Sequence, residues 1–353
     1  MSKFWSEMAK RAEPYVPGEQ LAKKNIIKLN TNENPYPPSP KVIEAIQNEL
    51  HTTNLRLYPS PTMDELRTTI GAYYGLDKAN VFVGNGSDEV LAFAFMGLFD
   101  PGKPIRFPQI TYSFYPVYAK VFNIDYEEVP LNDDFTLDVE RFFESVGGVI
   151  FPNPNAPTSI YLPLHEIERI LEHNKDRVVI VDEAYVDFAE ASAATLINKY
   201  DNLLVVQTMS KSRALAGLRV GFALGNNELI KGLIRMKDSF NSYPVDRLAL
   251  VGAKAAIEDE TYFREITKKI IQTRTWVTEE LQSLGFKVLP SQTNFVFTTH
   301  ETYPAERLYE ALKQRNILIR YFKTKPIENY VRITIGTDEE MKQLIRAIEE
   351  IIL

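Results

Sequence analysis

Lys211 and Asp182 are the two side chains whose types and positions best predict chemistry in this sequence. Asp182 directly follows the apolar run 178–181, and Lys211 follows the apolar run 203–206 among hydroxyl residues. Burial and nearby positive charge lower the pKa of a lysine, which supplies the neutral amine needed to attack a carbonyl carbon. A carboxylate after a buried strand needs a partner, such as a metal ion, a transferred proton or a cationic ring nitrogen. Either residue alone could have a purely structural role, so a functional role for them has to be argued from the neighbouring motifs.

A turn with two glycines predicts a phosphate site. The segment 84–89 runs from an apolar strand into a helix that begins near Ser87, with Asp88 in its first turn. A helix N-terminus presents free N–H groups and a positive dipole end to phosphate, although Ser87 could instead only cap the helix. Glu89 occupies the third-glycine position of G-x-G-x-x-G, which disfavours a dinucleotide site, and the sequence contains no P-loop motif. Further candidate phosphate ligands are Thr208, Ser210 and Arg219.

A rigid loop follows the apolar run 149–151. Residues 152–158 read PNPNAPT, so prolines restrict the backbone and asparagines supply hydrogen-bond donors. Ligands in open α/β sheets lie at the carboxyl ends of the strands, where these loops meet. We therefore expect four features to lie at the same edge of the sheet. In chain order they are a phosphate cradle, an asparagine loop, the acid Asp182 and the amine Lys211. Pyridoxal phosphate needs these parts: a carboxylate for its ring nitrogen and a lysine that binds its aldehyde and moves a proton.

The elements that must position these residues follow an α/β pattern. Short apolar runs and amphipathic segments alternate up to about residue 240, which predicts a large domain with a mostly parallel central sheet flanked by helices. Beyond it, a long helical region over 246–284, short strands and a last helix from Asp338 are typical of a small α+β domain. We expect an N-terminal arm over residues 1–35 associated with the small domain, a large cofactor-binding domain over 36–243 and a small C-terminal domain over 244–353.

The composition excludes several other classes. The chain of 353 residues has no cysteine, so disulfides, thiolate zinc sites and iron–sulfur clusters are excluded. Its four histidines lack metal-ligand spacing, so we expect no metal. A net charge of -7 disfavours nucleic acid as a partner. No apolar stretch approaches the roughly 18 residues of a membrane span. We therefore expect a cytoplasmic protein that acts on small molecules and has no membrane partner.

The chain resembles the fold type I, class II family of pyridoxal-phosphate-dependent aminotransferases, and within it the histidinol-phosphate aminotransferases. The resemblance runs from about Leu29 to the C-terminus. Its most specific segments are NTNENP (30–35), GNGSDE (84–89), DEAY (182–185), SK (210–211) and AGLRVG (216–221). It implies a transaminase of histidine biosynthesis that interconverts L-histidinol phosphate and 2-oxoglutarate with imidazole acetol phosphate and L-glutamate.

The resemblance also implies a role for individual residues. Lys211 would carry the cofactor as a Schiff base and shuttle the proton in both half-reactions. Asp182 would bind the ring nitrogen, and Tyr185 the phenolic oxygen. Tyr112 would stack on the ring, whereas Tyr58 would reach the cofactor phosphate of the other subunit in a homodimer. The implied phosphate ligands are Ser87, Asp88, Thr208, Ser210 and Arg219, and the implied substrate ligands are Arg320, Arg332, Tyr15 and Asn32.

The rigid loop departs from the family pattern at two positions. The family usually reads Asn-Pro-Thr-Gly where this chain reads Ala-Pro-Thr-Ser over 156–159. Ala156 thus replaces the asparagine that normally contacts the phenolic oxygen. Either Asn155 takes that role through a shifted loop, or the contact is lost. Ser159 in place of glycine predicts a changed backbone conformation.

Three alternative functions stay open at this point. A decarboxylase of an O-phosphorylated amino acid, similar to threonine-phosphate decarboxylase, and a broad aromatic or aspartate aminotransferase use the same fold and cofactor. They differ in the anionic groups that meet Arg320 and Arg332. A non-catalytic cofactor-binding regulatory module also shares the fold. It would need an attached DNA-binding domain, but only about 30 residues precede the matching region.

Overall fold

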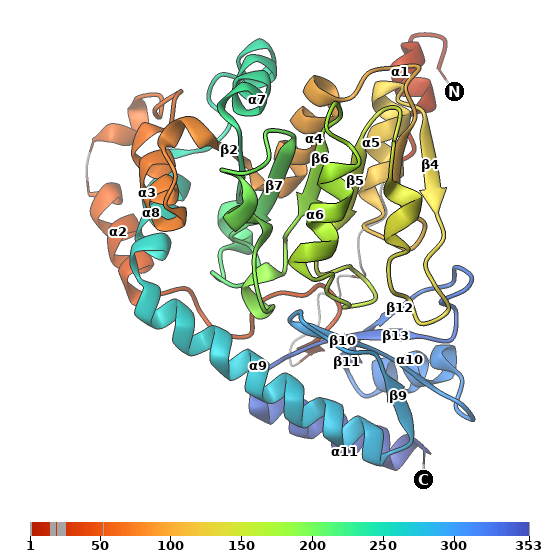
Figure 1. The fold of residues 1–353 in the computed structure, drawn as a ribbon. Coiled ribbons are helices and arrows are strands. Elements are labelled where there is room, and N and C mark those ends of the chain that lie inside the picture. Colours follow the sequence, from red (N-terminus) through yellow and green to blue (C-terminus); the bar gives the residue numbers. More distant parts are fainter. Residues whose placement is uncertain (1, 15–18, 20–25, 52, 353) are drawn as a thin grey trace.

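The computed structural model describes residues 2–14, 19, 26–51 and 53–352, and its centre is a seven-stranded sheet (Figure 1). The strand order is β2-β8-β7-β6-β5-β3-β4. Strand β8 runs antiparallel to both of its neighbours, and the remaining pairs along β7-β6-β5-β3-β4 are parallel. The strands are β2 (Val81–Asn85), β3 (Ile105–Pro108), β4 (Tyr126–Val129), β5 (Val149–Pro152), β6 (Val179–Asp182), β7 (Leu203–Thr208) and β8 (Val220–Gly225). The predicted mostly parallel sheet is confirmed.

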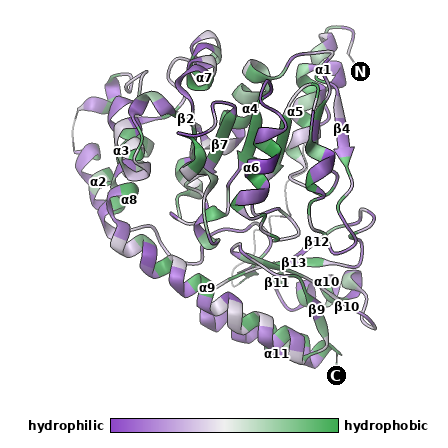
Figure 2. Ribbon diagram, viewed as in Figure 1, coloured by the Kyte–Doolittle hydropathy of each residue, from purple (hydrophilic) through white to green (hydrophobic). Residues whose placement is uncertain are grey.

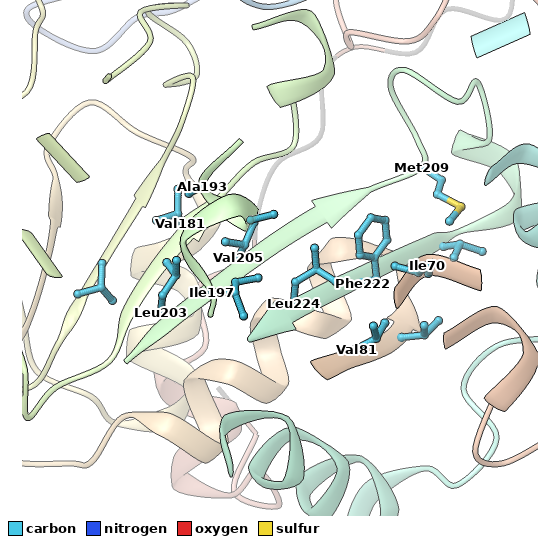
Figure 3. Packing of buried hydrophobic residues seen from close by; sticks show 14 of the residues in the cluster. Ile70, Val81, Val181, Ala193, Ile197, Leu203, Val205, Met209, Phe222 and Leu224 are labelled. Carbon is cyan, nitrogen blue, oxygen red and sulfur yellow. The ribbon is translucent and has the colours of Figure 1, made fainter. Parts of the chain in front are cut away.

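Helices cover both faces of this sheet because its strands are apolar on both sides. On β7, Val205 belongs to one core and Leu204 and Val206 to the opposite one. Figure 3 shows the first core, where Val205 lies near Val181 and Leu203. The helices over the first core are α2 (Pro40–Leu50), α3 (Asp64–Tyr74), α6 (Leu164–Glu172) and α8 (Arg247–Glu258); those over the second are α4 (Gly86–Leu98), α5 (Phe114–Phe122) and α7 (Asn227–Phe240).

A second, antiparallel sheet has the order β12-β13-β10-β9. Its strands are β9 (Phe286–Val288), β10 (Phe295–His300), β12 (Arg320–Tyr321) and β13 (Val331–Thr334). Helices α9 (Glu260–Ser283), α10 (Ala305–Gln314) and α11 (Asp338–Ile352) pack on its core. From the N-terminal part, β1 (Ile27–Lys28) pairs in parallel with β11 (Ile317–Leu318), and Leu29 joins the same core. Figure 1 shows α9 running from α8, beside the large sheet, to the small sheet.

The long helical region predicted over 246–284 is divided into two helices. Helix α8 ends at Glu258 and α9 begins at Glu260, with Asp259 between them. The Asp259 carboxylate accepts hydrogen bonds from Ser39 and Lys41, which anchors the break to the start of α2. Helix α8 packs on the core of the large sheet, whereas α9 extends to the small one. The boundary between the domains at residue 243 remains a prediction.

Several short helices lie in the connecting segments. Helix α1 (Glu7–Arg11) packs beside α5, where Arg11 donates hydrogen bonds to carbonyl groups at the end of that helix. Short 3-10 helices lie at Asn54–Arg56, Lys78–Asn80, Val139–Phe142, Val186–Phe188, Ala193–Leu196 and Ala216–Leu218. Figure 2 shows the central strands of the large sheet as hydrophobic and the edge strand β4 as largely hydrophilic, whereas α9 and α11 carry both hydrophilic and hydrophobic residues. Among the described residues, no helix combines the length and apolarity needed to cross a membrane.

Candidate active site

Two adjoining cavities lie at the carboxyl ends of β5, β6 and β7. The inner cavity, of about 300 Å³, reaches the N-terminus of α4, and the outer cavity, of about 280 Å³, reaches β12 and β13. Lys211, Tyr112 and Tyr185 line both. The candidate cofactor residues that line the inner cavity are Ser87, Asp88, Tyr112, Asp182, Tyr185, Thr208, Ser210, Lys211 and Arg219. The structure thus brings together residues from the ends of β2, β3, β6 and β7, and Arg219 from the start of β8.

One wall of the inner cavity carries hydroxyl groups and a guanidinium group. The Thr208 hydroxyl donates to Ser210 Oγ at 3.0 Å, and Arg219 Nη1 lies 3.5 Å from the same oxygen. Arg219 Nη2 donates to Asp88 Oδ2 at 3.0 Å, and the Tyr112 hydroxyl donates to Asp88 Oδ1 at 2.8 Å. Asp88 therefore fixes the orientation of both a cation and an aromatic ring. This combination of donors suits a phosphate group.

Strand β8 approaches the N-terminus of α4 closely at Gly221. A Cβ atom at Gly221 would lie 2.3 Å from the backbone nitrogen of Ser87, so no larger residue fits. Helix α4 begins at Gly86 with Asn85 in the N-cap position, and Asn85 makes no side-chain cap hydrogen bond. Ser87 is therefore a first-turn residue at the cavity and not the N-cap of the helix. Its position is compatible with binding an anion at the helix N-terminus.

Asp182 ends β6 with only 4% of its surface exposed. The buried Tyr115 hydroxyl donates to Asp182 Oδ2 at 2.8 Å, and the Ala184 N–H donates to Oδ1 at 3.3 Å. Burial raises the pKa of Asp182 to about 6; the two hydrogen bonds lower it, and the charge of Asp88 raises it. The carboxylate is thus ionised at neutral pH and close to protonation. A cationic ring nitrogen would stabilise the ionised form.

The adjacent acid, Glu183, belongs to a different environment. Its carboxylate accepts hydrogen bonds from Ser192 Oγ at 2.6 Å, the Ala193 N–H at 2.6 Å and Gln207 Nε2 at 2.9 Å. Burial raises the pKa of Glu183 to about 7, and these donors lower it. Glu183 does not line either cavity. Of the two neighbouring acids, only Asp182 is placed for chemistry with a ligand.

Lys211 is held by the segment that follows β1. Its Nζ donates to the Thr31 carbonyl at 3.1 Å and lies 5.9 Å from the centroid of the Tyr185 ring. The side-chain amide of Asn34 donates to the carbonyls of Lys211 at 2.9 Å and Ser212 at 3.1 Å. The N-terminal segment therefore restrains both the amine and the backbone of this lysine. Sequence reasoning did not identify Asn34 in this role, although it lies in the NTNENP motif.

Asn32 connects Tyr185 to the small sheet. Its Nδ2 donates to the Tyr185 hydroxyl at 2.8 Å, and its Oδ1 accepts from Thr334 Oγ1 at 3.0 Å. The Tyr185 ring packs edge-to-face on Phe295 at 5.1 Å between centroids. Asn32 also lines the outer cavity. Its side chain holds the phenol in place at the junction of the two cavities.

Two arginines lie opposite each other in the outer cavity. Arg320 on β12 pairs in register with Arg332 on β13, and both line this cavity. Their guanidinium carbons lie 5.6 Å and 5.8 Å from the centroid of the Phe322 ring, and Arg332 Nη2 donates to the Asn30 carbonyl at 3.1 Å. Like charges directly opposite on adjacent strands repel. An anion bound near both side chains would remove that repulsion.

Three candidate residues lie outside both cavities or outside the described part of the chain. Asn155 lines neither cavity; its amide donates to the Ile110 carbonyl at 3.0 Å and to Thr158 Oγ1 at 2.9 Å, whereas Ala156 lines both. Tyr58 is 78% exposed and stacks on Tyr243 at 4.6 Å between ring centroids. Tyr15 lies outside the described residues. The cofactor role of Asn155 remains a prediction that this hydrogen bonding does not support.

Ser159 keeps a glycine-like backbone despite its side chain. Its φ of 69° lies in the left-handed region that glycine adopts most readily. Its buried hydroxyl donates hydrogen bonds to the carbonyls of Thr158 and Pro290. The loop therefore makes a left-handed turn at this position, and a change of backbone conformation relative to the family remains a prediction. Within the described residues, no group of three or more potential ligands is placed to hold a metal ion.

Comparisons with known proteins agree on one family. A family model described as aminotransferase class I and II matches residues 24–348. A histidinol-phosphate aminotransferase 1 of Oceanobacillus iheyensis is 59% identical over 352 residues, covering 100% of this chain and 99% of the relative. A histidinol-phosphate aminotransferase of Clostridium acetobutylicum is 56% identical over 352 residues, with 100% of both chains covered. The crystal structure of histidinol-phosphate aminotransferase from Sinorhizobium meliloti in complex with pyridoxal-5'-phosphate has a TM-score of 0.89 at 24% identity, covering 100% of this chain and 98% of that one.

Proposed function

Because this chain belongs to the class I and II aminotransferase family, we propose that it transfers an amino group between L-histidinol phosphate and 2-oxoglutarate. The products are imidazole acetol phosphate and L-glutamate, a reaction of histidine biosynthesis. Relatives that match the whole chain at 54–59% identity carry the name histidinol-phosphate aminotransferase. Their names favour this activity over the decarboxylase, over a broad aromatic or aspartate aminotransferase and over a regulatory module.

The arginine pair of the outer cavity is the observation that carries the substrate assignment. Arg320 and Arg332 face each other across β12 and β13 next to the cavity that contains Lys211. Histidinol phosphate and 2-oxoglutarate each carry an anionic group away from the carbon that exchanges the amine. One arginine pair could therefore bind both substrates in turn and place their reacting carbons towards Lys211.

The inner cavity fits pyridoxal phosphate as the cofactor. Its volume of about 300 Å³ is at the lower end of ligand pockets. The hydroxyl groups and Arg219 on one wall would bind the phosphate, Asp182 would hold the ring nitrogen, and Tyr112 would cover a face of the ring. When bound, this cofactor supplies an aldehyde that exchanges amino groups and a ring that accepts electrons.

Lys211 would perform the proton transfer. Its amine lies at the junction of the two cavities, so it would take a proton from the substrate carbon and return one to the cofactor side. Tyr185, oriented by Asn32, would donate or accept a hydrogen bond at the phenolic oxygen of the cofactor. The contact that the family's asparagine makes with the phenolic oxygen would be lost, because Ala156 stands at that position in the cavity wall and Asn155 does not line the cavity.

We also propose that the enzyme works as a cytoplasmic homodimer. Tyr58 and Leu57 are exposed, and Leu50 and Leu55 add further apolar surface nearby in the chain. The Tyr58 side chain does not line the inner cavity of its own chain. It would instead reach the cofactor phosphate of the partner subunit.

A cysteine-free chain is compatible with the reducing cytoplasm.

Absorbance of the purified protein loaded with pyridoxal phosphate tests the proposed activity. Histidinol phosphate, added without an oxo acid, should convert the visible absorbance of the bound cofactor to that of its amine form. Addition of 2-oxoglutarate should restore the original spectrum. The Lys211→Ala variant should show neither change. If histidinol phosphate leaves the spectrum unchanged while a phosphorylated amino acid alters it, the substrate assignment is wrong.

Replacement of one arginine tests the anion site. Arg332→Gln should raise the KM for histidinol phosphate by about tenfold to a hundredfold, since a charge-assisted hydrogen bond to an anion contributes about 1.5–3 kcal/mol. The affinity for pyridoxal phosphate should stay unchanged. Arg346→Gln, at an exposed position on α11, is the matched control and should leave KM unaltered. An unchanged KM in Arg332→Gln would remove the arginine from the substrate site.

A further inference from the structure

Tyr115 is a fully buried tyrosine that contacts the proposed ring-nitrogen acid. It lies on α5, is 0% exposed, and donates its hydroxyl proton to Asp182 Oδ2 at 2.8 Å. We propose that Tyr115 is a positioning residue, whose hydroxyl keeps the Asp182 carboxylate ionised and aimed at the ring nitrogen of the cofactor. This inference rests on the proposed function and adds to it a residue that does not line either cavity.

The surrounding rings leave the Tyr115 hydroxyl a single orientation. Phe107 and Tyr112 pack edge-to-face on Tyr115 at 5.9 Å and 5.8 Å between centroids, and Phe95 packs at a tilt at 6.4 Å. Water does not reach the ring, because none of its surface is exposed. A buried hydroxyl needs a partner, and here the partner is the Asp182 carboxylate. Packing therefore fixes the donor before any ligand binds.

The Asp182 carboxylate depends on this donor because its other hydrogen bond is weak. The Ala184 nitrogen lies 3.3 Å from Oδ1, just beyond the usual range of N–H to oxygen hydrogen bonds. Burial, and then the charge of Asp182, raise the pKa of Tyr115 well above its usual value, so the hydroxyl keeps its proton and remains a donor. A hydrogen bond to the charged form of an acid lowers its pKa, and this one opposes the desolvation of Asp182.

The other charged and titratable groups around Asp182 do not replace Tyr115. Asp88, from α4, raises the pKa of Asp182 through charge repulsion. Tyr112 and Tyr118 lie close enough to feel the charge of Asp182, but their hydroxyls donate to Asp88. Lys211 shares the inner cavity and donates to the Thr31 carbonyl. Without the Tyr115 hydroxyl, Asp182 would take up a proton at higher pH and would lose its attraction for a cationic nitrogen.

The pH dependence of cofactor binding to the apoprotein tests this role. In the wild type, affinity for pyridoxal phosphate should rise as the pH rises through about 6, where Asp182 ionises. In Tyr115→Phe, that rise should occur about one to two pH units higher, because one hydrogen bond to a charged group is lost. Titration of the ligand itself is common to both proteins, so the difference reports on the protein. A fluorinated tyrosine at position 115, a stronger donor of the same shape, should move the rise to lower pH.

Two further variants separate positioning from general damage. Tyr74→Phe removes another tyrosine hydroxyl, which donates to the buried Gln207 at 2.6 Å, and should leave the pH profile unchanged. In an Asp182→Asn background, Tyr115→Phe should have no additional effect on cofactor affinity. An unchanged profile in Tyr115→Phe, beside a wild type that binds the cofactor, overturns the role of Tyr115 and leaves the proposed function intact. A wild type that binds no pyridoxal phosphate overturns both.

Discussion

At the scale of single residues, two adjacent acids, Asp182 at the end of β6 and Glu183 directly after it, have different environments. Asp182 lines the inner cavity, whereas Glu183 is bound by Ser192, Ala193 and Gln207. Both are buried, and burial raises the pKa of each. Only Asp182 is placed to bind a cationic ligand, which would offset the free-energy cost of burying its charge. A buried acid facing a ligand cavity is typical of a functional group that the fold alone does not stabilise.

Asp182 should destabilise the apoprotein as it ionises. Its pKa of about 6 in the fold, against 3.8 normally, means that the folded state holds its proton more tightly than the unfolded chain. The contribution of Asp182 to stability is therefore lost as the pH rises from about 4 to about 6. A rise of about 2 pKa units at about 1.36 kcal/mol each corresponds to about 3 kcal/mol at neutral pH.

The Asp182→Asn variant should make the apoprotein more stable at pH 7 while it weakens cofactor binding. Chemical denaturation at low and at neutral pH measures the difference in free energy of unfolding. Most of the gain, up to about 3 kcal/mol, should be absent at pH 4 because Asp182 is then neutral in the wild type. Asp133→Asn, at an exposed position, is the matched control. Equal stability of wild type and Asp182→Asn at both pH values would contradict the buried charge.

At the scale of elements, the cavity depends on the contact between β8 and the N-terminus of α4. Strand β8 is antiparallel to β2 and β7 and carries Gly221 against Ser87. Residue 219, directly before β8, has φ 55° and sends the Arg219 guanidinium towards Asp88 on α4. The close contact therefore fixes the distance between the N-terminus of α4 and the Arg219 guanidinium group. A phosphate ligand would have to fit between these two groups.

Gly221→Ala should separate these elements. The added methyl group would lie 2.3 Å from the Ser87 nitrogen, so strand or helix must shift. We expect a loss of stability of about 1–3 kcal/mol, as for overpacked cores, and a lower affinity for pyridoxal phosphate. Thermal unfolding and cofactor titration measure both effects. Gly217→Ala is the control, because no atom lies within 4 Å of its added Cβ, and it should change stability by less than about 0.5 kcal/mol. Similar effects of the two variants would contradict the close-contact explanation.

At the scale of the whole molecule, the two sheets and the N-terminal segment meet at the site. Tyr185, which follows β6 of the large sheet, accepts a hydrogen bond from Asn32, and Asn32 accepts one from Thr334 of β13. Arg320 and Arg332 come from the small sheet, and Lys211 follows β7 of the large one. A movement of one sheet relative to the other would change the distance from the arginine pair to Lys211. The proposed homodimer would add Tyr58 of the partner subunit to this assembly.

Mixing two defective variants tests that shared site. Lys211→Ala and Tyr58→Ala should each have low activity. The first variant lacks the amine that transfers the proton, and the second lacks the side chain that reaches the cofactor phosphate of the partner subunit. In a mixed dimer, the chain with Tyr58→Ala supplies an intact Lys211, and its site receives Tyr58 of the partner subunit. Random exchange would make about one quarter of the sites complete. Transaminase activity after mixing should therefore exceed the mean of the two separate proteins. Activity that stays at that mean would contradict a site built from two chains.

Most of the inner cavity could be predicted from the sequence, because its residues lie in short local motifs. Lys211 and Ser210 follow one apolar run, Asp182 follows another, and Ser87 follows a strand that leads into a helix. Strand periodicity and helix starts depend on neighbours in the chain, and the carboxyl ends of parallel strands meet at one edge. The resemblance to a known family extended this prediction to Arg320 and Arg332, which have no comparable local signal.

Only the tertiary structure decided the contacts between distant segments. Tyr115 reaches Asp182 from α5, and Asn34 reaches Lys211 from the N-terminal part. Ala156 lines the cavity, whereas its neighbour Asn155 does not. Tyr115 lies in an apolar helix, where the sequence predicts an aromatic residue of the core, so no local pattern predicts its hydrogen bond to Asp182. The physical reason is that the strand order β2-β8-β7-β6-β5-β3-β4 differs from the chain order. The strand order and the packing determine which distant side chains come into contact. The periodicity of the sequence does not predict either of them.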